Sequence, residues 1–190
     1  MSIRWIITIV ISIFLPACQH PSLTAQQQHQ YQTEAKTIVS QFTGILKPEL
    51  KQALQSGGPS KAIEVCSQKA PALTRQLSKK TGWSIRRVSL KPRNHLTAIP
   101  DAWEKKILQQ FDRDQLAGKL PAGMTATRVE HRQFRFMKAQ IVEPVCLLCH
   151  GTQITPDVAA ALKKYYPMDQ ARGYELGQVR GAFSLMKQLK

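Results

Sequence analysis

The stretch "FRFMKAQIVEPVCLLCHG", residues 134–151, carries two signals that organise the rest of the chain. Its first part, 134–142, is rich in aromatic and β-branched residues, which favours a strand. Its second part holds Cys146, Cys149 and His150 in the spacing C-x-x-C-H, which is typical of haem c attachment. Two thiols at this spacing can form thioethers along one porphyrin edge, and the histidine that follows can then bind the iron. We therefore predict one covalent haem c, with His150 as an axial ligand.

Three other chemistries could use the same motif. A structural zinc site needs four ligands, and the motif supplies three with no second Cys/His pair at finger spacing. A thioredoxin-type redox pair would follow a strand, as here, but the histidine and glycine after it do not favour that interpretation. A disulfide between Cys146 and Cys149 is compatible with an oxidising compartment. The complete C-x-x-C-H pattern favours haem over all three.

Outward from the motif, the chain alternates between helical and extended patterns. Proline and glycine divide it: Pro48 is expected to kink or end the first helix, "SGGPS" at 56–60 is a break, and Pro71 is expected to split the second helix. Asp101 and Glu104 have the spacing of a capping box. Helices are predicted at 34–46, 61–80, 101–117 and 156–166, and strands at 83–90, 125–131, 134–142 and 177–187. This order predicts an α+β domain around an antiparallel sheet with helices beside it.

The sixth iron position needs a ligand from elsewhere, unless it stays open. Cys66 lies on the apolar side of the predicted helix 61–80, where it is either a ligand or an inert core cysteine. The rival ligands are Met124, Met137, His131 and His95. We expect Met137 in the core, His131 within a strand and His95 in a polar loop. A methionine ligand would raise the potential of the haem, and a thiolate would lower it.

A group of basic residues, Arg86, Arg87, Lys91 and Arg93, follows the predicted second helix. Guanidinium groups bind carboxylates in a forked geometry, and a haem carries two propionates. We expect Arg86 and Arg93 to contribute to cofactor binding in this way. The alternative is that strand alternation leaves these side chains in solvent.

The N-terminus has the pattern of an export signal. Arg4 precedes an apolar run at 5–15, which is too short to span a bilayer, and "LPAC" then resembles a bacterial lipobox. We predict a lipoprotein signal peptide at 1–17, with Cys18 lipidated as the first mature residue, and a flexible polar tether at 18–32. Ordinary secretion is the alternative. Either way the protein is expected on the periplasmic side of a bacterial membrane, where haem c attachment takes place.

The formal net charge of +15 favours an anionic partner. Nucleic acid fits an exported protein badly, so we expect no nucleic acid. An acidic redox or signalling protein, or the membrane surface reached through the lipid anchor, fits better. Solvated basic faces without a specific partner are the alternative.

Four stretches carry a resemblance to a known family: "AIEVCSQKAPALTRQLSKKTGWSIRRVSLKPRN", "IPDAWEKKILQQF", "FRFMKAQIVEPVCLLCHG" and "YYPMDQARGYELGQVRGAFSLMK". In order and spacing they resemble the bacterial family catalogued as domain of unknown function 3365, from about residue 35 to the end. The resemblance implies a PAS-like domain with one c-type haem, here at 33–190. It also implies His/Cys axial ligation, carried over to His150 and Cys66.

Together these observations predict an exported monohaem c-type protein that acts in electron transfer or in redox or gas sensing, and not an enzyme. A haem enzyme, such as a peroxidase or a gas reductase, would need an open sixth site and a distal acid–base pair. A module without haem, held by zinc or a disulfide at 146–150, is the remaining alternative.

Overall fold

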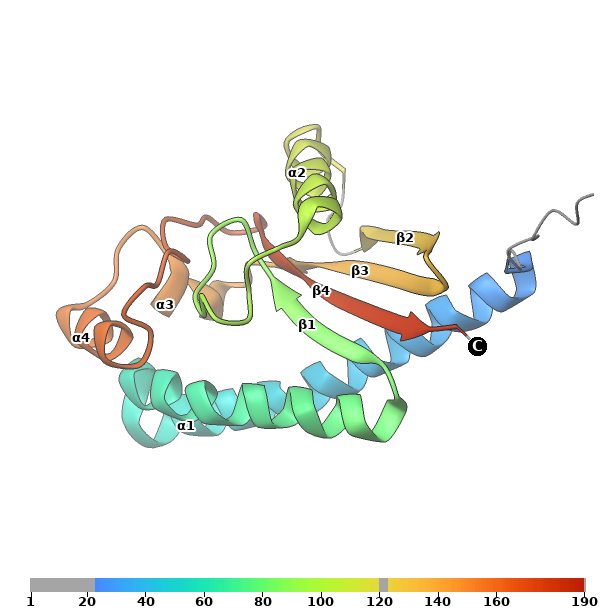
Figure 1. Ribbon diagram of the computed structural model, residues 1–190. Helices are drawn as coiled ribbons and strands as arrows, with labels where there is room; N and C mark the ends of the chain where they lie inside the picture. The colour runs from blue at the N-terminus through green and yellow to red at the C-terminus, as the bar shows by residue number, and fades with distance from the viewer. Residues whose placement is uncertain (1–22, 120–122, 190) are drawn as a thin grey trace, which may run out of the picture.

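A computed structural model describes residues 23–119 and 123–189. It shows a mixed α+β domain built on one four-stranded antiparallel sheet, with strand order β1-β4-β3-β2 (Figure 1). The strands are β1 (Ser84–Val88), β2 (Thr125–Glu130), β3 (Gln133–Ile141) and β4 (Val179–Gln188). The predicted α+β class with an antiparallel sheet is confirmed, as are all four predicted strands. The predicted signal peptide and the lipidated Cys18 lie outside the described residues.

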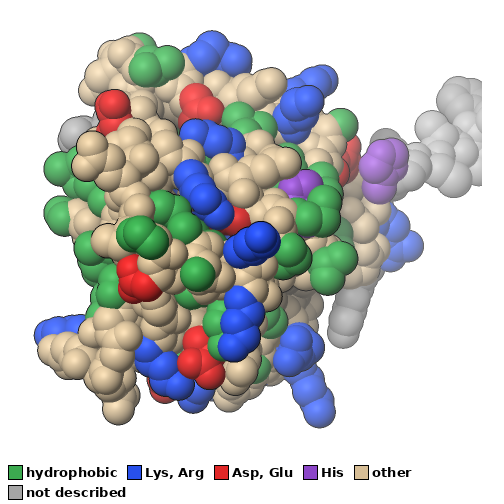
Figure 2. Space-filling view, turned by 90° about the vertical axis from the view of Figure 1, so that its left-hand side faces the viewer, with side chains coloured by type: hydrophobic (Ala, Val, Ile, Leu, Met, Phe, Trp, Pro, Cys, Tyr) green, Lys and Arg blue, Asp and Glu red, His purple; other side chains and the backbone are tan. Residues whose placement is uncertain are grey.

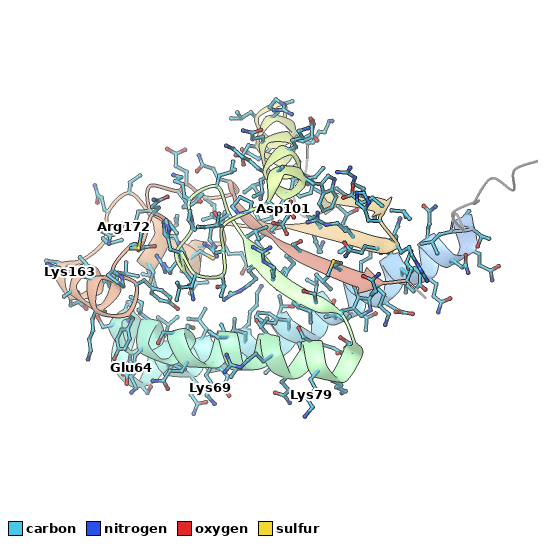
Figure 3. All side chains as sticks on the ribbon, in the orientation of Figure 1. Glu64, Lys69, Lys79, Asp101, Lys163 and Arg172 are labelled. Atoms are coloured by element: carbon cyan, nitrogen blue, oxygen red, sulfur yellow. The ribbon has the colours of Figure 1, made fainter. Side chains whose placement is uncertain are left out.

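The first helical element, α1 (Ala25–Thr81), is a hairpin of two helical arms that lies against one face of the sheet (Figure 1). The arms meet at Gly57 and Gly58, whose backbone is not helical, and Gly58 has φ 69°, which favours glycine. The break predicted at 56–60 is therefore confirmed. Figure 3 labels Glu64, Lys69 and Lys79 along the second arm, and Lys69 pairs there with Glu49 of the first arm at 3.4 Å.

Two predictions about α1 are wrong. Residues 25–32 are not part of a tether but form the first turns of the helix, which a capping box between Thr24 and Gln27 begins. Tyr31 packs there against Trp83 and Phe134, with ring centroids 6.2 and 5.4 Å apart.

Pro71 does not divide the second arm. Pro48 was expected to kink or end the first arm, and the helix does not end there. A proline removes one N–H donor from a helix. Ala70, Leu73 and Leu77 on both sides of Pro71 are buried in one core cluster, so packing keeps the helix continuous across the missing hydrogen bond.

The sheet separates two layers of core. On the α1 side, Phe134, Phe136, Phe183 and Leu185 pack against the helical hairpin. On the other side lies α2 (Ala102–Leu116), which buries Leu108 and Phe111 against alternate residues of the same strands. Asp101 and Glu104 form the predicted capping box at its start. The two-residue turn His131–Arg132 joins β2 and β3 with both φ values positive.

The remaining short elements gather at one end of the sheet (Figure 1). These are η2 (Pro144–Cys146), α3 (Leu147–His150) and α4 (Pro156–Tyr165), and α4 contacts α1. Among the described residues, no helix is both long enough and apolar enough to cross a membrane.

Candidate functional site

The C-x-x-C-H motif follows β3 directly and folds as one tight turn. Cys146 closes η2, and Cys149 and His150 complete α3. Since residues three apart lie on one side of a helical turn, both thiols belong to the same side of this turn. Both are half-buried and free, and the backbone N–H of Glu143 donates to the Cys146 sulfur at 3.3 Å. The turn therefore presents two unbonded thiols beside a histidine.

His150 is held by one hydrogen bond from its ring. Its Nδ1 lies 2.7 Å from the carbonyl oxygen of Ala171. Because a carbonyl only accepts, Nδ1 carries the proton, and the Nε2 lone pair is available for a metal. Burial, followed by the charges of Arg180 and Arg93, lowers the pKa of His150 from 6.5 to about 2. The imidazole is therefore neutral across the physiological pH range, which is the form that binds metals.

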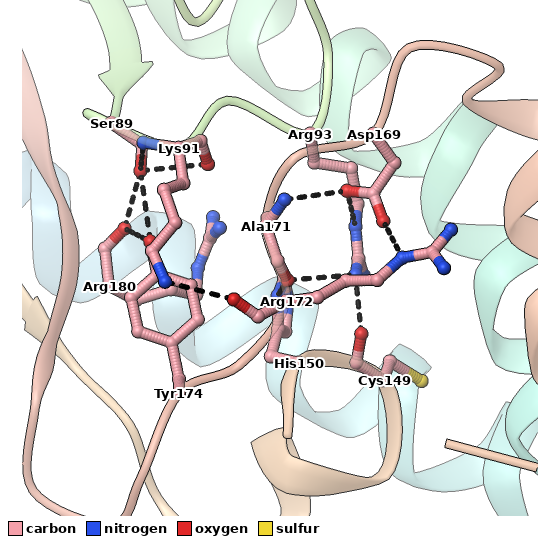
Figure 4. Close-up of polar contacts among 10 residues, drawn as sticks. All are labelled: Ser89, Lys91, Arg93, Cys149, His150, Asp169, Ala171, Arg172, Tyr174 and Arg180. Carbon is pink, nitrogen blue, oxygen red and sulfur yellow. Dashed lines mark hydrogen bonds and ion pairs between the residues drawn. The ribbon is translucent and has the colours of Figure 1, made fainter. Parts of the chain in front are cut away.

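A buried ion pair holds the motif against the loop that follows α4 (Figure 4). Arg93 Nε lies 3.1 Å from Asp169 Oδ1, and the Arg93 guanidinium also donates to the carbonyls of Cys149 and Ala171. The same carboxylate accepts from the Ala171 N–H at 3.0 Å and from Arg172 Nε at 3.0 Å. The carbonyl that orients His150 thus accepts from Arg93, and Asp169 holds both Arg93 and the Ala171 N–H.

A second network lies on the other side of the histidine. The Tyr174 ring meets His150 edge-on, with centroids 6.3 Å apart. The Tyr174 and Ser89 hydroxyls both donate to the carbonyl oxygen of Arg180, at 3.1 and 2.6 Å (Figure 4). Lys91 lies 4.3 Å from the centre of the Tyr174 ring and donates to the Arg172 carbonyl at 2.9 Å.

Cys66, in the second arm of α1, faces the same region. Burial raises the pKa of its thiol, while the charges of Arg87 and Arg93 oppose this rise. Burial likewise raises the pKa of Cys149; Arg93 opposes this, and Cys66 and Cys146 add to it. The charges of Cys66 and Arg93 both affect Cys149, so the predicted ligand and the predicted attachment site lie in the same region.

The other predicted residues fall in different places. Arg93 belongs to the site, but its guanidinium N–H groups already donate to Asp169 and to the carbonyls of Cys149 and Ala171. Arg86 lies on the opposite face of the sheet, where it donates to the Ile99 carbonyl at 2.6 Å and lies 3.6 Å from Glu104. The expectation that Arg86 contributes to cofactor binding is therefore wrong. Successive residues of a strand face opposite sides of the sheet, so Arg87, and not Arg86, faces the site.

The rival ligands are mostly excluded by position. Met137 is fully buried in the core on the α2 side of the sheet, and Met124 packs against the same cluster. His131 was predicted within a strand, but it lies in the exposed β2–β3 turn. His95 remains a candidate, since its Nε2 is buried without a partner.

Sequence reasoning missed Arg180, Tyr174 and Asp169. A lone arginine in the apolar strand "VRGAFSL" was the available signal for Arg180. Asp169 had none, since its ion pair is formed with Arg93, 76 positions earlier in the chain.

The space beside the motif is small. A cavity of about 280 Å³ is lined by Leu147, Gly151, Thr152, Gln153, Tyr174, Glu175 and Leu176. This lies below the range of roughly 300–1,000 Å³ typical of ligand pockets. Within residues 23–119 and 123–189, no group of three or more His, Cys, Asp or Glu side chains is placed to hold a metal ion.

Fold and site together define an α+β domain with one C-x-x-C-H turn at the end of an antiparallel sheet. A family model described as Tll0287-like matches residues 23–187, so the chain belongs to the Tll0287-like family. A solved structure, described as the cyanobacterial haem protein Tll0287, has a similar fold with a TM-score of 0.62 and 21% sequence identity. The likeness covers 82% of this chain and 93% of that one. A comparison with curated proteins found no match.

Proposed function

We propose that this protein binds one haem c, attached through Cys146 and Cys149, with His150 as an axial ligand through Nε2. The observation that carries the proposal is the hydrogen bond of 2.7 Å between Nδ1 and the Ala171 carbonyl. It leaves Nε2 unprotonated beside two free thiols, which is the donor set that the motif requires. Membership of the Tll0287-like family and the similar fold of a protein described as a haem protein support the same proposal.

Cys66 is proposed as the second axial ligand. Its helix packs against the end of the sheet that carries the motif, and its thiol interacts with that of Cys149. Burial raises the pKa of its thiol, and the charges of Arg87 and Arg93 oppose this rise and so favour the thiolate, which is the form that binds metals. A haem with both axial positions filled supplies one-electron transfer.

The residues around the proposed site hold its ligands in place. Asp169 fixes the Ala171 N–H, and the Ala171 carbonyl fixes the tautomer and orientation of His150. Burial keeps the imidazole from taking up a proton. Ligands that need no rearrangement suit electron transfer, and a thiolate ligand that can leave would suit redox or gas sensing. We propose a carrier or sensor of PAS-like type for these reasons, and not an enzyme.

We also propose that the protein is exported and anchored to the membrane surface through Cys18.

On the end of the molecule where α3 and α4 lie, a broken band of Lys and Arg side chains runs down the middle of the surface (Figure 2). Such a surface suits an acidic redox or signalling protein.

The test is the visible spectrum of the protein produced in a host that matures c-type haem, recorded oxidised and then reduced in alkaline pyridine. One c-type haem per chain is the expected result, with an oxidised spectrum of the low-spin thiolate type. A colourless protein from a competent host would overturn the proposal, and zinc and disulfide content would then be measured. Carbon monoxide binding at once to the reduced iron would instead favour an open sixth site.

A further inference from the structure

Two arginines at the site have no acidic partner. Arg87 and Arg180 are half-buried, and neither forms an ion pair in the part of the chain that is described, whereas Arg93 is paired with Asp169. Arg180 Nη1 is fully buried and has no hydrogen-bond partner, and Figure 4 draws no polar contact to its guanidinium. Arg87 lies above the Phe42 ring, 5.3 Å from its centre. A buried charge is costly unless it is paired, so this arrangement lacks a negatively charged group.

A β-bulge places Arg180. Gln140 pairs with Gly181, but the next residue of β3, Ile141, pairs with Val179, so Arg180 is the extra residue. As a result Val179, and not Arg180, joins the core on the α2 side of the sheet. Gly181 makes the bulge compatible with β1, because a Cβ there would come within 2.4 Å of the Val88 carbonyl oxygen. Gln140, opposite the bulge, also has a buried side-chain oxygen without a partner.

Arg87 and Arg180 come from neighbouring strands, because Arg87 of β1 pairs with Phe183 of β4. Burial, and then the charges of Arg87 and Arg93, lowers the pKa of Arg180 to about 10. Burial is also the main cause that lowers the pKa of Arg87, and the Cys66 thiol opposes this. Two positive charges without an ion-pair partner among the described residues therefore lie on adjacent strands, at the end of the sheet that carries the motif.

We propose that Arg87 and Arg180 bind the two propionate carboxylates of the haem, an inference that rests on the proposed function. Two guanidinium groups match two carboxylates in charge and in forked hydrogen bonding. Arg93 is excluded because Asp169 already neutralises it, and Arg86 because it lies on the opposite face.

The test measures the midpoint potential of the haem from pH 5 to 9 in Arg87→Gln and Arg180→Gln, with Arg86→Gln as the matched control. Arg86→Gln removes the same charge from the same strand as Arg87→Gln, on the other face of the sheet. Loss of a positive charge beside the propionates favours the oxidised iron. We therefore expect lower potentials, with a stronger pH dependence, in Arg87→Gln and Arg180→Gln, and no change in the control. Haem content should stay at one per chain, because the cysteines attach it.

Potentials in Arg87→Gln and Arg180→Gln that equal the control would overturn this inference and leave the proposed function intact. A wild-type protein without covalent haem would overturn both. The two arginines come from different strands, so if either variant fails to fold the other still decides. Arg180→Lys adds a second measurement: it keeps the charge and should lie closer to wild type than Arg180→Gln, and a potential as low as that of Arg180→Gln would contradict the role of charge.

Discussion

The guanidinium of Arg93 and the carboxylate of Asp169 form a buried ion pair that joins three separate segments of the chain. The Asp169 side chain is 1% exposed, and its partner is 14% exposed. Through this pair the β1–α2 loop, the C-x-x-C-H turn and the loop before β4 meet at one point (Figure 4). The orientation of His150 thus depends on a carboxylate far from it in sequence.

Asp169→Asn should destabilise the protein strongly. Removing one partner of a buried pair leaves an uncompensated charge, here among other arginines, and typically costs about 3–5 kcal/mol of unfolding free energy. Denaturant unfolding followed by circular dichroism measures the loss. Glu143→Gln is the control, since its pair with Lys47 at 2.7 Å is half-exposed and should contribute less than about 1 kcal/mol. Equal losses in the two variants would argue against a special role for Asp169.

Cys66→Ala should keep the haem covalently attached but change the oxidised spectrum and raise the midpoint potential, because a thiolate ligand lowers it. Cys66→Met should also raise the potential while supplying a neutral sulfur. Ser67→Ala, one position further along the same helix, is the control and should behave as wild type. If the spectrum and potential of Cys66→Ala match those of wild type, Cys66 is not a ligand, and His95 becomes the next residue to replace.

Gly181→Ala should weaken the contact between β1 and β4. The new Cβ would lie 2.4 Å from the Val88 carbonyl oxygen and 3.1 Å from Ser89 Cβ, so the strands must separate at the bulge. Overpacking of this kind costs about 1–3 kcal/mol. Thermal or denaturant unfolding measures it.

Gly44→Ala should stabilise the protein, in contrast to Gly181→Ala. Gly44 is exposed in α1, and a Cβ there would meet nothing within 4 Å. Because glycine weakens a helix interior, this substitution should stabilise the protein by about 0.5–1 kcal/mol. A loss of stability in Gly44→Ala would show that the first arm of α1 is not helical at this position.

Asp101→Ala should lose stability in a pH-dependent manner. Burial raises the pKa of Asp101, but the N–H of Glu104 and the Arg135 side chain lower it further, so it lies below its ordinary value of 3.8. A depressed pKa means that the carboxylate stabilises the folded state above pH 3.8, and that this contribution is lost as the pH falls through the folded value. Loss of the N-cap should cost about 1 kcal/mol at pH 7.

Unfolding free energies of wild type and Asp101→Ala, measured from pH 7 to pH 3, check this prediction. The difference between them should shrink toward the acid end. Asp101→Asn keeps a capping oxygen without the charge, so it should lose less stability than Asp101→Ala at pH 7. A difference that is constant with pH would show that the charge contributes nothing.

Local chemistry in the sequence determined much of this protein. The glycine pair at 57–58 breaks α1, and Asp101 with Glu104 begins α2, because turns and caps are satisfied by residues a few positions apart. The spacing of Cys146, Cys149 and His150 is likewise fixed within a single turn. These features could be predicted because their partners are neighbours in the chain.

Tertiary structure decided the rest. Residues 25–32 are helical because Tyr31 meets aromatic side chains just before β1 and in β3, and the second arm of α1 continues past Pro71 because the core holds it. Which arginine of β1 faces the site depends on the side of the sheet that α1 covers. The position of Arg180 depends on a bulge that reverses the alternation of β4, and alternation in the sequence alone carries no sign of an extra residue.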